Sequence, residues 1–218
     1  MLTFYHTPLS VNSRRVWVAL LEKGLTFEAV EMNLGGDQFK PEFLALNPFH
    51  HIPVLVDDGF SVIESFAILD YLEAKYPTPA LLPSDPIALA NTRMVEMVTL
   101  NELNPAMTPL FKEMMGFGTE SPEAVEQAKQ KIDGVLKFYA DKLGEGDFFG
   151  GDQLTLADIV AGTFSPWFEK MGLPMANYPT LQAWTARLVA RPAWQATQPT
   201  EEMIAAFRDR MKARMAKG

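Results

Sequence analysis

The chain has 218 residues, of which 48% are hydrophobic, and a formal net charge of −8. This length suits one large domain or two small ones, with enough apolar residues for a core without disulfides or metals. The acidic balance argues against nucleic acid as a partner, because phosphate binding needs basic surface. The chain contains no cysteine, which excludes a disulfide scaffold, a Cys-x-x-Cys redox site and a cysteine-ligated zinc.

Targeting and membrane segments are not expected. The N-terminus has no basic leader followed by an apolar stretch, so the sequence predicts no signal peptide. No window is apolar over the roughly eighteen residues that a bilayer-spanning helix needs. We therefore expect a cytoplasmic protein with no membrane as partner.

The chain opens with alternating extended and helical patterns. Leu2–Tyr5 predicts a strand, and an amphipathic segment that begins near Ser10 predicts a helix, which Gly24 ends. Residues 26–32 predict a second strand. Because a helix joins these two strands, we expect a parallel βαβ unit with a right-handed crossover.

A hairpin and two further helices complete this first part. Residues 38–46 predict a short helix, and 53–57 and 60–63 predict strands around Asp58-Gly59, a strong hairpin-turn signal. Residues 65–76 predict the last helix. The predicted order is therefore β-α-β-α-β-β-α.

A proline-rich linker separates this part from a helical one. Four prolines lie within ten residues: Pro77, Pro79, Pro83 and Pro86. They predict a first domain at 1–77, a linker at 78–86 and a second domain at 87–218. The second domain shows helical periodicity and no convincing strand, with helices expected at about 87–115, 121–143, 155–171, 179–191 and 200–216. These helices are expected to pack as an all-α bundle.

One helix start in the second domain is unusually well marked. Thr155 is a good N-cap, and Asp158 stands three residues later, where a capping box needs its acidic partner. Leu154 and Ile159 occupy the positions of a hydrophobic staple. This motif predicts structure and not chemistry.

Ser10 is the candidate chemical residue. It stands where the first strand gives way to a helix, whose first backbone N–H groups have no partner within the helix and whose dipole adds positive charge. A thiolate is well stabilised at such a place. Because the chain has no cysteine, the thiolate must come from a ligand. The residues alone leave two interpretations open: Ser10 activates a visiting thiol, or it caps the helix.

Several motifs in order resemble those of the cytosolic glutathione transferases. Residues 8–16 look like the serine-type active-site segment of the phi, theta and zeta classes, and 47–55 resemble the loop that carries a cis-proline. Residues 63–68 match the segment that grips the γ-glutamyl end of glutathione, and the capping box is also typical. The resemblance covers essentially the whole chain. The first eighty residues look closest to the cyanobacterial chi class, known for conjugating isothiocyanates.

This resemblance implies both the fold and the activity. It implies a thioredoxin-like N-terminal domain followed by an all-helical domain. The expected activity is that of a detoxifying enzyme, a glutathione transferase, which conjugates glutathione to isothiocyanates, aryl halides or haloacids. Glutathione is then the co-substrate, no metal is needed, and the protein is expected to form a homodimer.

The resemblance also assigns site residues. Ser10 is the expected catalytic residue. Those expected to contact glutathione are Gln38, His51, Ile52, Pro53, Glu64 and Ser65. The backbone of Ile52 pairs with the cysteinyl part, Ser65 takes the γ-glutamyl carboxylate with Glu64 near the ammonium, and His51 contacts the glycyl carboxylate. A plain helix start at Glu64-Ser65 and a purely stabilising Pro53 are the simpler alternatives.

The second substrate is expected to enter between the domains, a favoured place for ligand pockets. The residues expected to line its pocket are Leu9, Asn12, Met107, Phe111, Met114, Phe117 and Trp167. Methionines adapt to varied electrophiles, but Met and Phe at helical spacing are also ordinary core residues.

Alternative roles stay open at this level. The runner-up donors to a thiol are Tyr5, His6 and Ser13, with Asn12 next if Ser10 is only a cap. Arg14 could add positive field, but a surface or interdomain ion pair is the favoured expectation. The same fold could also serve a glutathione-dependent isomerase or dehalogenase, or a non-catalytic module that binds other proteins.

Overall fold

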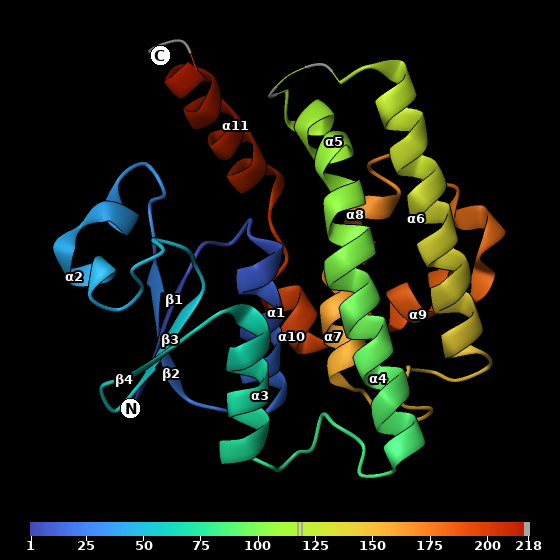
Figure 1. Ribbon diagram of the computed structural model, residues 1–218, viewed down its shortest axis with the longest axis horizontal. Coiled ribbons are helices and arrows are strands. Elements are labelled where there is room, and N and C mark those ends of the chain that lie inside the picture. Colours follow the sequence, from blue (N-terminus) through green and yellow to red (C-terminus); the bar gives the residue numbers. More distant parts are fainter. Residues whose placement is uncertain (117, 119, 216–218) are drawn as a thin grey trace. The chain divides into compact units, whose positions relative to one another are not determined.

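The computed structural model describes residues 1–116, 118 and 120–215, with the backbone alone from residue 211 (Figure 1). The chain forms two units. The N-terminal unit comprises Met1–Leu81 and receives Pro192–Pro199 from the end of the chain, and the helical unit comprises the described residues of 82–191 and 200–215.

A four-stranded mixed sheet forms the centre of the N-terminal unit. Its strands are β1 (Leu2–His6), β2 (Phe27–Glu31), β3 (Val54–Asp57) and β4 (Phe60–Ile63), in the spatial order β2-β1-β3-β4. β1 runs parallel to β2 and antiparallel to β3, with Phe4 opposite Leu55. Asp58 and Gly59 both have positive φ, 48° and 88°, as a two-residue hairpin turn requires. The predicted β-α-β-α-β-β-α order is confirmed.

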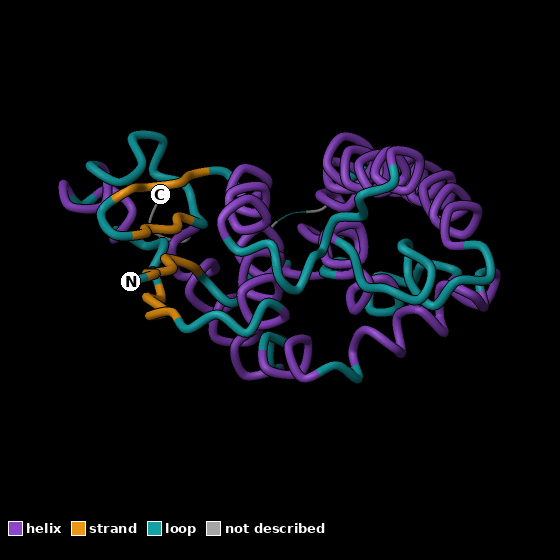
Figure 2. The backbone as a smooth tube through the Cα atoms, turned by 90° about the horizontal axis from the view of Figure 1, so that it is seen from below, coloured by secondary structure: helices purple, strands orange, loops and turns teal. Residues whose placement is uncertain are grey.

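Helices cover both faces of this sheet. They are α1 (Val11–Glu22), the 3-10 turn η1 (Asp37–Phe39), α2 (Pro41–Leu44), α3 (Ser65–Lys75) and the late α10 (Pro192–Ala196). α1 and α3 pack together on one side of the sheet, and α2 lies on the other (Figures 1 and 2).

One helix prediction in this unit was wrong in detail, and one helix was missed. Residues 38–46 do not form a single helix, because Lys40, which precedes Pro41, is extended (ψ 140°) and α2 starts afresh at Pro41. α10 was not predicted, because five residues are too few for a helical period to show.

The two faces of the sheet bury separate cores. Phe4 is buried on the face opposite Tyr5, and Val16 of α1 and Leu72 of α3 are buried as well. On the α2 face, Met32, Phe43 and Val54 form a buried cluster against which other side chains pack: Tyr5, Val30, Leu34, Leu46, Ile52, Val56 and Ile63. This second core fixes Ile52 and Leu34 at the edge of the sheet, where the site described below lies.

The helical unit is built from α4 (Pro86–Val98), the π-helix η2 (Thr99–Leu103), α5 (Asn104–Met115), α6 (Pro122–Leu143), α7 (Leu156–Gly162), α8 (Ser165–Phe168), the 3-10 turn η3 (Met175–Asn177), α9 (Pro179–Val189) and α11 (Glu201–Met215). The helix predicted over 87–115 contains a π-turn before Pro105, which has no N–H to donate. The helix predicted over 155–171 is also interrupted and resumes one residue before Pro166. Within the described chain, no helix is long and apolar enough to cross a membrane.

The predicted capping box is formed and extends into a larger network. The carboxylate of Asp158 is buried and accepts hydrogen bonds from the N–H and the hydroxyl of Thr155, both at 2.8 Å. It also accepts bonds from the Phe149 N–H and the Trp184 indole N–H, both at 2.9 Å. Burial raises the pKa of Asp158, and these four donors oppose that shift. The network ties the start of α7 to α9.

We predict that Thr155→Ala lowers the free energy of unfolding by about 1–2 kcal/mol, because a buried carboxylate loses one of its donors. Urea denaturation measures this loss. Thr108→Ala is the matched control, since the exposed Thr108 hydroxyl bonds only to a carbonyl of its own helix, at 3.2 Å. That control is expected to stay within about 0.5 kcal/mol of the original protein. Equal losses in both variants would contradict the assignment.

Candidate functional site

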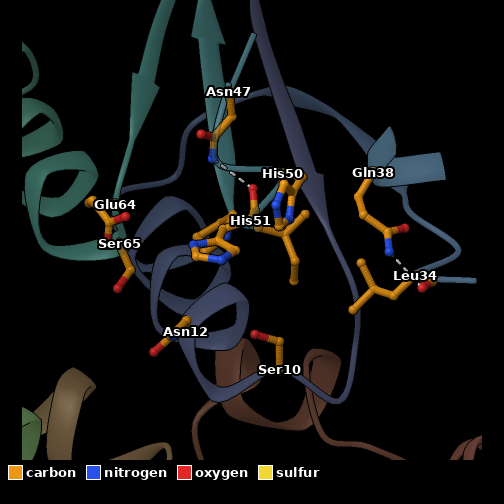
Figure 3. Close-up of a pocket in the computed structure, with 11 residues that line it drawn as sticks. Ser10, Asn12, Leu34, Gln38, Asn47, His50, His51, Glu64 and Ser65 are labelled. Atoms are coloured by element: carbon orange, nitrogen blue, oxygen red, sulfur yellow. Dashed lines mark hydrogen bonds between the residues drawn. The ribbon is translucent and has the colours of Figure 1, made fainter. Parts of the chain in front are cut away.

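The N-terminal unit carries a cavity of about 420 Å³ at the edge of its sheet (Figure 3). Eleven residues line it: Ser10, Asn12, Leu34, Gln38, Asn47, His50, His51, Ile52, Pro53, Glu64 and Ser65. In Figure 3, Glu64 and Ser65 lie at one end, Leu34 and Gln38 at the other, and Ser10 between them. The residues on its two sides therefore differ in chemistry: a carboxylate and a hydroxyl lie on one side, an amide and an apolar side chain on the other.

Ser10 is the N-cap of α1. Its backbone is extended, and its hydroxyl oxygen accepts a hydrogen bond from the Ser13 N–H at 3.2 Å. Because the hydroxyl serves the cap as an acceptor, its proton is still available for a ligand in the cavity. The first backbone hydrogen bond of α1 runs from the Arg14 N–H to the Ser10 carbonyl, at 2.8 Å. The N–H groups of Val11 and Asn12 come before this bond and have no acceptor within the helix. Capping and thiol activation are thus compatible roles for one serine.

The runner-up donors lie outside the cavity. His6 is buried between the rings of Phe4 and Trp17, with centroids 4.9 and 4.5 Å away. Burial lowers its pKa to about 4, so the imidazole is neutral near pH 7. The Ser13 hydroxyl is fully buried, and Tyr5 packs into the core on the α2 face. None of the three lines the cavity.

The loop before β3 forms one wall. The buried Asn47 side chain donates to the His51 carbonyl at 2.9 Å and accepts from the Phe49 N–H at 3.0 Å (Figure 3). His50 has a φ of 49°, and the Ile52-Pro53 peptide bond is cis, as the resemblance implied. Asn47 therefore holds the shape of the loop that brings His51 and Ile52 to the cavity.

The start of α3 forms the end of the cavity opposite Gln38. Glu64 precedes α3 with a φ of 67°, a strained value for a residue with a side chain, and Ser65 opens the helix. The first backbone hydrogen bond of α3 runs from the Ile68 N–H to the Glu64 carbonyl, at 2.9 Å. The N–H groups that precede it in the first turn have no acceptor within the helix. These groups and the helix dipole make this end suited to a carboxylate.

The Gln38 end offers neutral polar groups. The Gln38 amide donates to the Leu34 carbonyl at 2.8 Å, and its own side-chain oxygen is buried with no hydrogen-bond partner among the described residues. Among the described residues that line the cavity, none is a lysine or an arginine, and Glu64 is the only carboxylate. Across the described residues, no group of three His, Asp or Glu side chains could hold a metal ion.

The structure brings together residues that lie far apart in the sequence. Ser10, Asn12 and all six predicted glutathione contacts line the same cavity. Sequence reasoning did not name Leu34, Asn47 or His50 as lining residues. Asn47 could have been found from the Asn-Pro turn signal, since an Asn side chain often bonds to the backbone two residues on. Leu34 and His50 carry no such signal.

The residues predicted to bind the second substrate are not gathered in this cavity, Asn12 excepted. Leu9 is half-buried in the N-terminal unit. In the helical unit, Met107 and Trp167 are buried, Met114 is half-buried, and the Phe111 ring lies 6.1 Å from that of Trp167. Phe117 lies outside the described residues. An electrophile-binding role for this set stays a prediction.

Comparisons with known proteins give matching results over both units. Residues 4–80 match the family model for the N-terminal domain of glutathione S-transferase, and 98–192 match that for the C-terminal domain. Maleylacetoacetate isomerase of Rattus norvegicus is 31% identical over 87% of this chain and 88% of its own. Glutathione S-transferase 3 of Zea mays is 35% identical, over 90% and 92%. A transferase homologue from Sulfitobacter, solved with bound glutathione, has a TM-score of 0.75 at 26% identity, over 91% and 97%.

Proposed function

The chain belongs to the glutathione S-transferase family, and we propose that it ionises the thiol of glutathione beside Ser10 and transfers the sulfur to small electrophiles. Isothiocyanates, aryl halides and haloacids are the electrophile classes proposed. One observation carries the proposal: the Ser10 hydroxyl stands midway along a cavity whose two ends suit the two ends of this tripeptide.

Each part of glutathione has a proposed partner. The γ-glutamyl carboxylate binds at Ser65 and the first turn of α3, and Glu64 faces the ammonium. The cysteinyl backbone pairs with Ile52, as an added strand does. At the other end the unpartnered oxygen of Gln38 accepts the glycyl N–H, and His51 donates to the glycyl carboxylate. The cavity volume, about 420 Å³, lies within the range of about 300–1,000 Å³ typical of small-molecule sites.

The Ser10 hydroxyl and the start of α1 can together supply the free energy that ionisation of the glutathione thiol needs. A free thiol has a pKa of about 8.5, so a few per cent is ionised at pH 7. Lowering that pKa by about two units needs roughly 2.7 kcal/mol. A hydrogen bond to a charged acceptor contributes about 1.5–3 kcal/mol and a helix terminus about 0.3–1 kcal/mol. The thiol proton goes to water and the thiolate attacks the electrophilic carbon. A halide then leaves as an anion, or the isothiocyanate nitrogen takes a proton from water.

We predict that Ser10→Ala lowers the rate of conjugation at least tenfold while the affinity for glutathione stays nearly unchanged, because one donor to the thiolate is lost. Steady-state kinetics and calorimetry measure the two quantities. Ser121→Ala is the matched control: Ser121 also caps a helix, α6, and accepts from the Ala124 N–H at 3.2 Å. It is expected to cost about 1 kcal/mol of stability and no activity. Unchanged turnover in Ser10→Ala would show that Ser10 is only a cap, and Asn12 would be tested next.

A glutathione-dependent isomerase is the second candidate, because a relative 31% identical is named maleylacetoacetate isomerase. The two activities differ in stoichiometry: a transferase consumes one glutathione per product, whereas an isomerase regenerates it. We predict that turnover of isothiocyanates, aryl halides or haloacids stops when glutathione is exhausted, which titration of the remaining thiol would show. Sustained turnover of maleylacetoacetate at substoichiometric glutathione would identify an isomerase instead. Retention on glutathione-agarose without turnover of any substrate would identify a binding module.

We propose different roles for the two domains. The N-terminal domain, 1–77, binds glutathione, and the helical domain, 87–218, contributes side chains that contact the electrophile. Ring and thioether groups of Phe111 and Met114 suit apolar electrophiles of varied shape. Substitution at these two positions is expected to change electrophile preference more than glutathione affinity.

We also propose a homodimer. Exposed apolar side chains follow one another along α4 and η2, at Met94, Met97 and Leu100, and the N-terminal unit exposes Phe49 and Phe60. Exposed apolar groups gathered on one element favour an interface. In the proposed dimer the N-terminal unit of one copy packs against α4 of its partner.

The dimer has a direct test. We predict that the double variant Met94→Lys, Met97→Lys is monomeric in analytical ultracentrifugation while the original protein is dimeric, because two charges cannot be buried at an apolar contact. Val189→Lys is the matched control, since Val189 on α9 is 37% exposed and Met94 is 41% exposed. A dimer that survives the double substitution would place the interface elsewhere.

A further inference from the structure

Arg14 is a charged side chain buried in the first turn of α1, the helix that Ser10 caps. It lies one helical turn beyond Ser10 on α1, and only 2% of it is exposed. Charged side chains are almost never buried to this extent unless they are paired. Sequence reasoning favoured an ion pair for Arg14, and the structure corrects that expectation.

The partners of Arg14 are neutral. Its Nε donates to the Thr197 hydroxyl at 3.4 Å, and one Nη donates to the Gln198 side-chain oxygen at 2.7 Å. The other Nη is buried with no hydrogen-bond partner, and no carboxylate in the described chain pairs with this guanidinium. The segment 192–199, whose helix α10 packs on α1, contains no charged residue at all. The positive charge is therefore uncompensated.

Arg14 follows Ser10 by four residues, and its backbone N–H donates to the Ser10 carbonyl at 2.8 Å. Residues four apart share one face of a helix, with Cβ atoms about 5–6 Å apart. Cα–Cβ bonds tilt towards the N-terminus of a helix, so the stem of Arg14 leans over the turn that begins at Ser10. Arg15 points elsewhere, with its guanidinium 5.1 Å from the centre of the Phe66 ring.

We propose that Arg14 is a positioning residue of this enzyme: its charge, held by Thr197 and Gln198, stabilises the glutathione thiolate beside Ser10. This inference rests on the proposed function. A nearby positive charge favours the ionised form of a thiol. Burial lowers the pKa of Arg14 to about 10, which leaves the guanidinium protonated at pH 7. The carboxylates at and along α3 are Glu64, which lines the cavity, Asp70, and Glu73, which pairs with Lys23.

A buried cation without a counter-ion does not favour folding. Replacing buried charges by apolar side chains of similar volume is often neutral or stabilising. Arg14→Met is therefore expected to fold, with a melting temperature equal to or above that of the original protein. If Arg14→Met impairs thiol ionisation but leaves the melting temperature unchanged or higher, Arg14 acts in the chemistry and not in packing.

The test measures the pKa of the thiol of bound glutathione by ultraviolet absorbance of the thiolate. Arg14→Met is expected to raise this pKa by about one unit, so that roughly fivefold less thiolate forms at pH 6.5. Arg14→Lys is expected to restore most of the shift, and Gln198→Leu to cause a smaller rise. Affinity for S-methylglutathione, which has no ionisable thiol, is expected to stay unchanged. Arg187→Met, which removes a partly exposed arginine of the helical unit, is the control for net charge.

The outcomes separate this inference from the proposed function. If the thiol pKa is lowered in the original protein and has the same value in Arg14→Met, the role of Arg14 is wrong and the proposed function is unaffected. A bound thiol that ionises no more readily than free glutathione in the original protein overturns both. If Arg14→Met does not fold, Arg14→Gln removes the charge and keeps a hydrogen-bonding amide, and an unchanged thiol pKa in that variant overturns the inference equally.

Discussion

The site depends on the start of α1. Backbone N–H groups that have no acceptor within the helix lie there beside the Ser10 hydroxyl. β1 ends at His6 and α1 begins at Val11, so four residues turn the chain from strand to helix. The Ser10 oxygen satisfies the Ser13 N–H and keeps its proton for a ligand. The remaining donors of the first turn can be satisfied only by water or by an anion.

The opposite wall is formed by strained backbone that the two cores support. His50 and Glu64 both have positive φ, 49° and 67°, which costs a residue with a side chain about 1–3 kcal/mol. The Asn47 side chain braces the first of these positions, and the cluster of Met32, Phe43 and Val54 packs against Ile52 next to it. Strain of this kind persists where the surrounding structure determines the backbone, and it gathers at binding sites.

Charge is distributed in an unusual way for a site that binds an anionic peptide. The chain carries a formal charge of −8, and the cavity lining, as far as the structure describes it, contains no lysine or arginine. Carboxylates of the ligand therefore depend on helix ends, backbone N–H groups and imidazole. Such donors act at contact distance, so salt screens them less than it screens exposed ion pairs. In the proposed role, Arg14 adds a buried positive charge four residues after Ser10, and it is not among the residues that line the cavity.

Local sequence signals determined the elements and much of the site. The Asp58-Gly59 turn, the Thr155–Asp158 capping box and the strand-helix junctions at Ser10 and Ser65 each depend on residues within a few positions of one another, so a pattern in the chain suffices to predict them. The resemblance to the glutathione transferases predicts that these junctions belong to one site. These predictions depend on residues close together in the sequence and not on distant contacts.

Tertiary structure alone decided the rest. The sequence cannot show that Asn47 braces the His51 carbonyl across a folded loop, or that the Gln38 oxygen is left unpartnered, because both depend on how the loop packs. Arg14 is the clearest case. Its partners stand 183 and 184 residues later in the chain, and periodicity carries no information about such a pairing. Burial and charge compensation are properties of the packed fold, whereas helix starts and turns are properties of neighbouring residues.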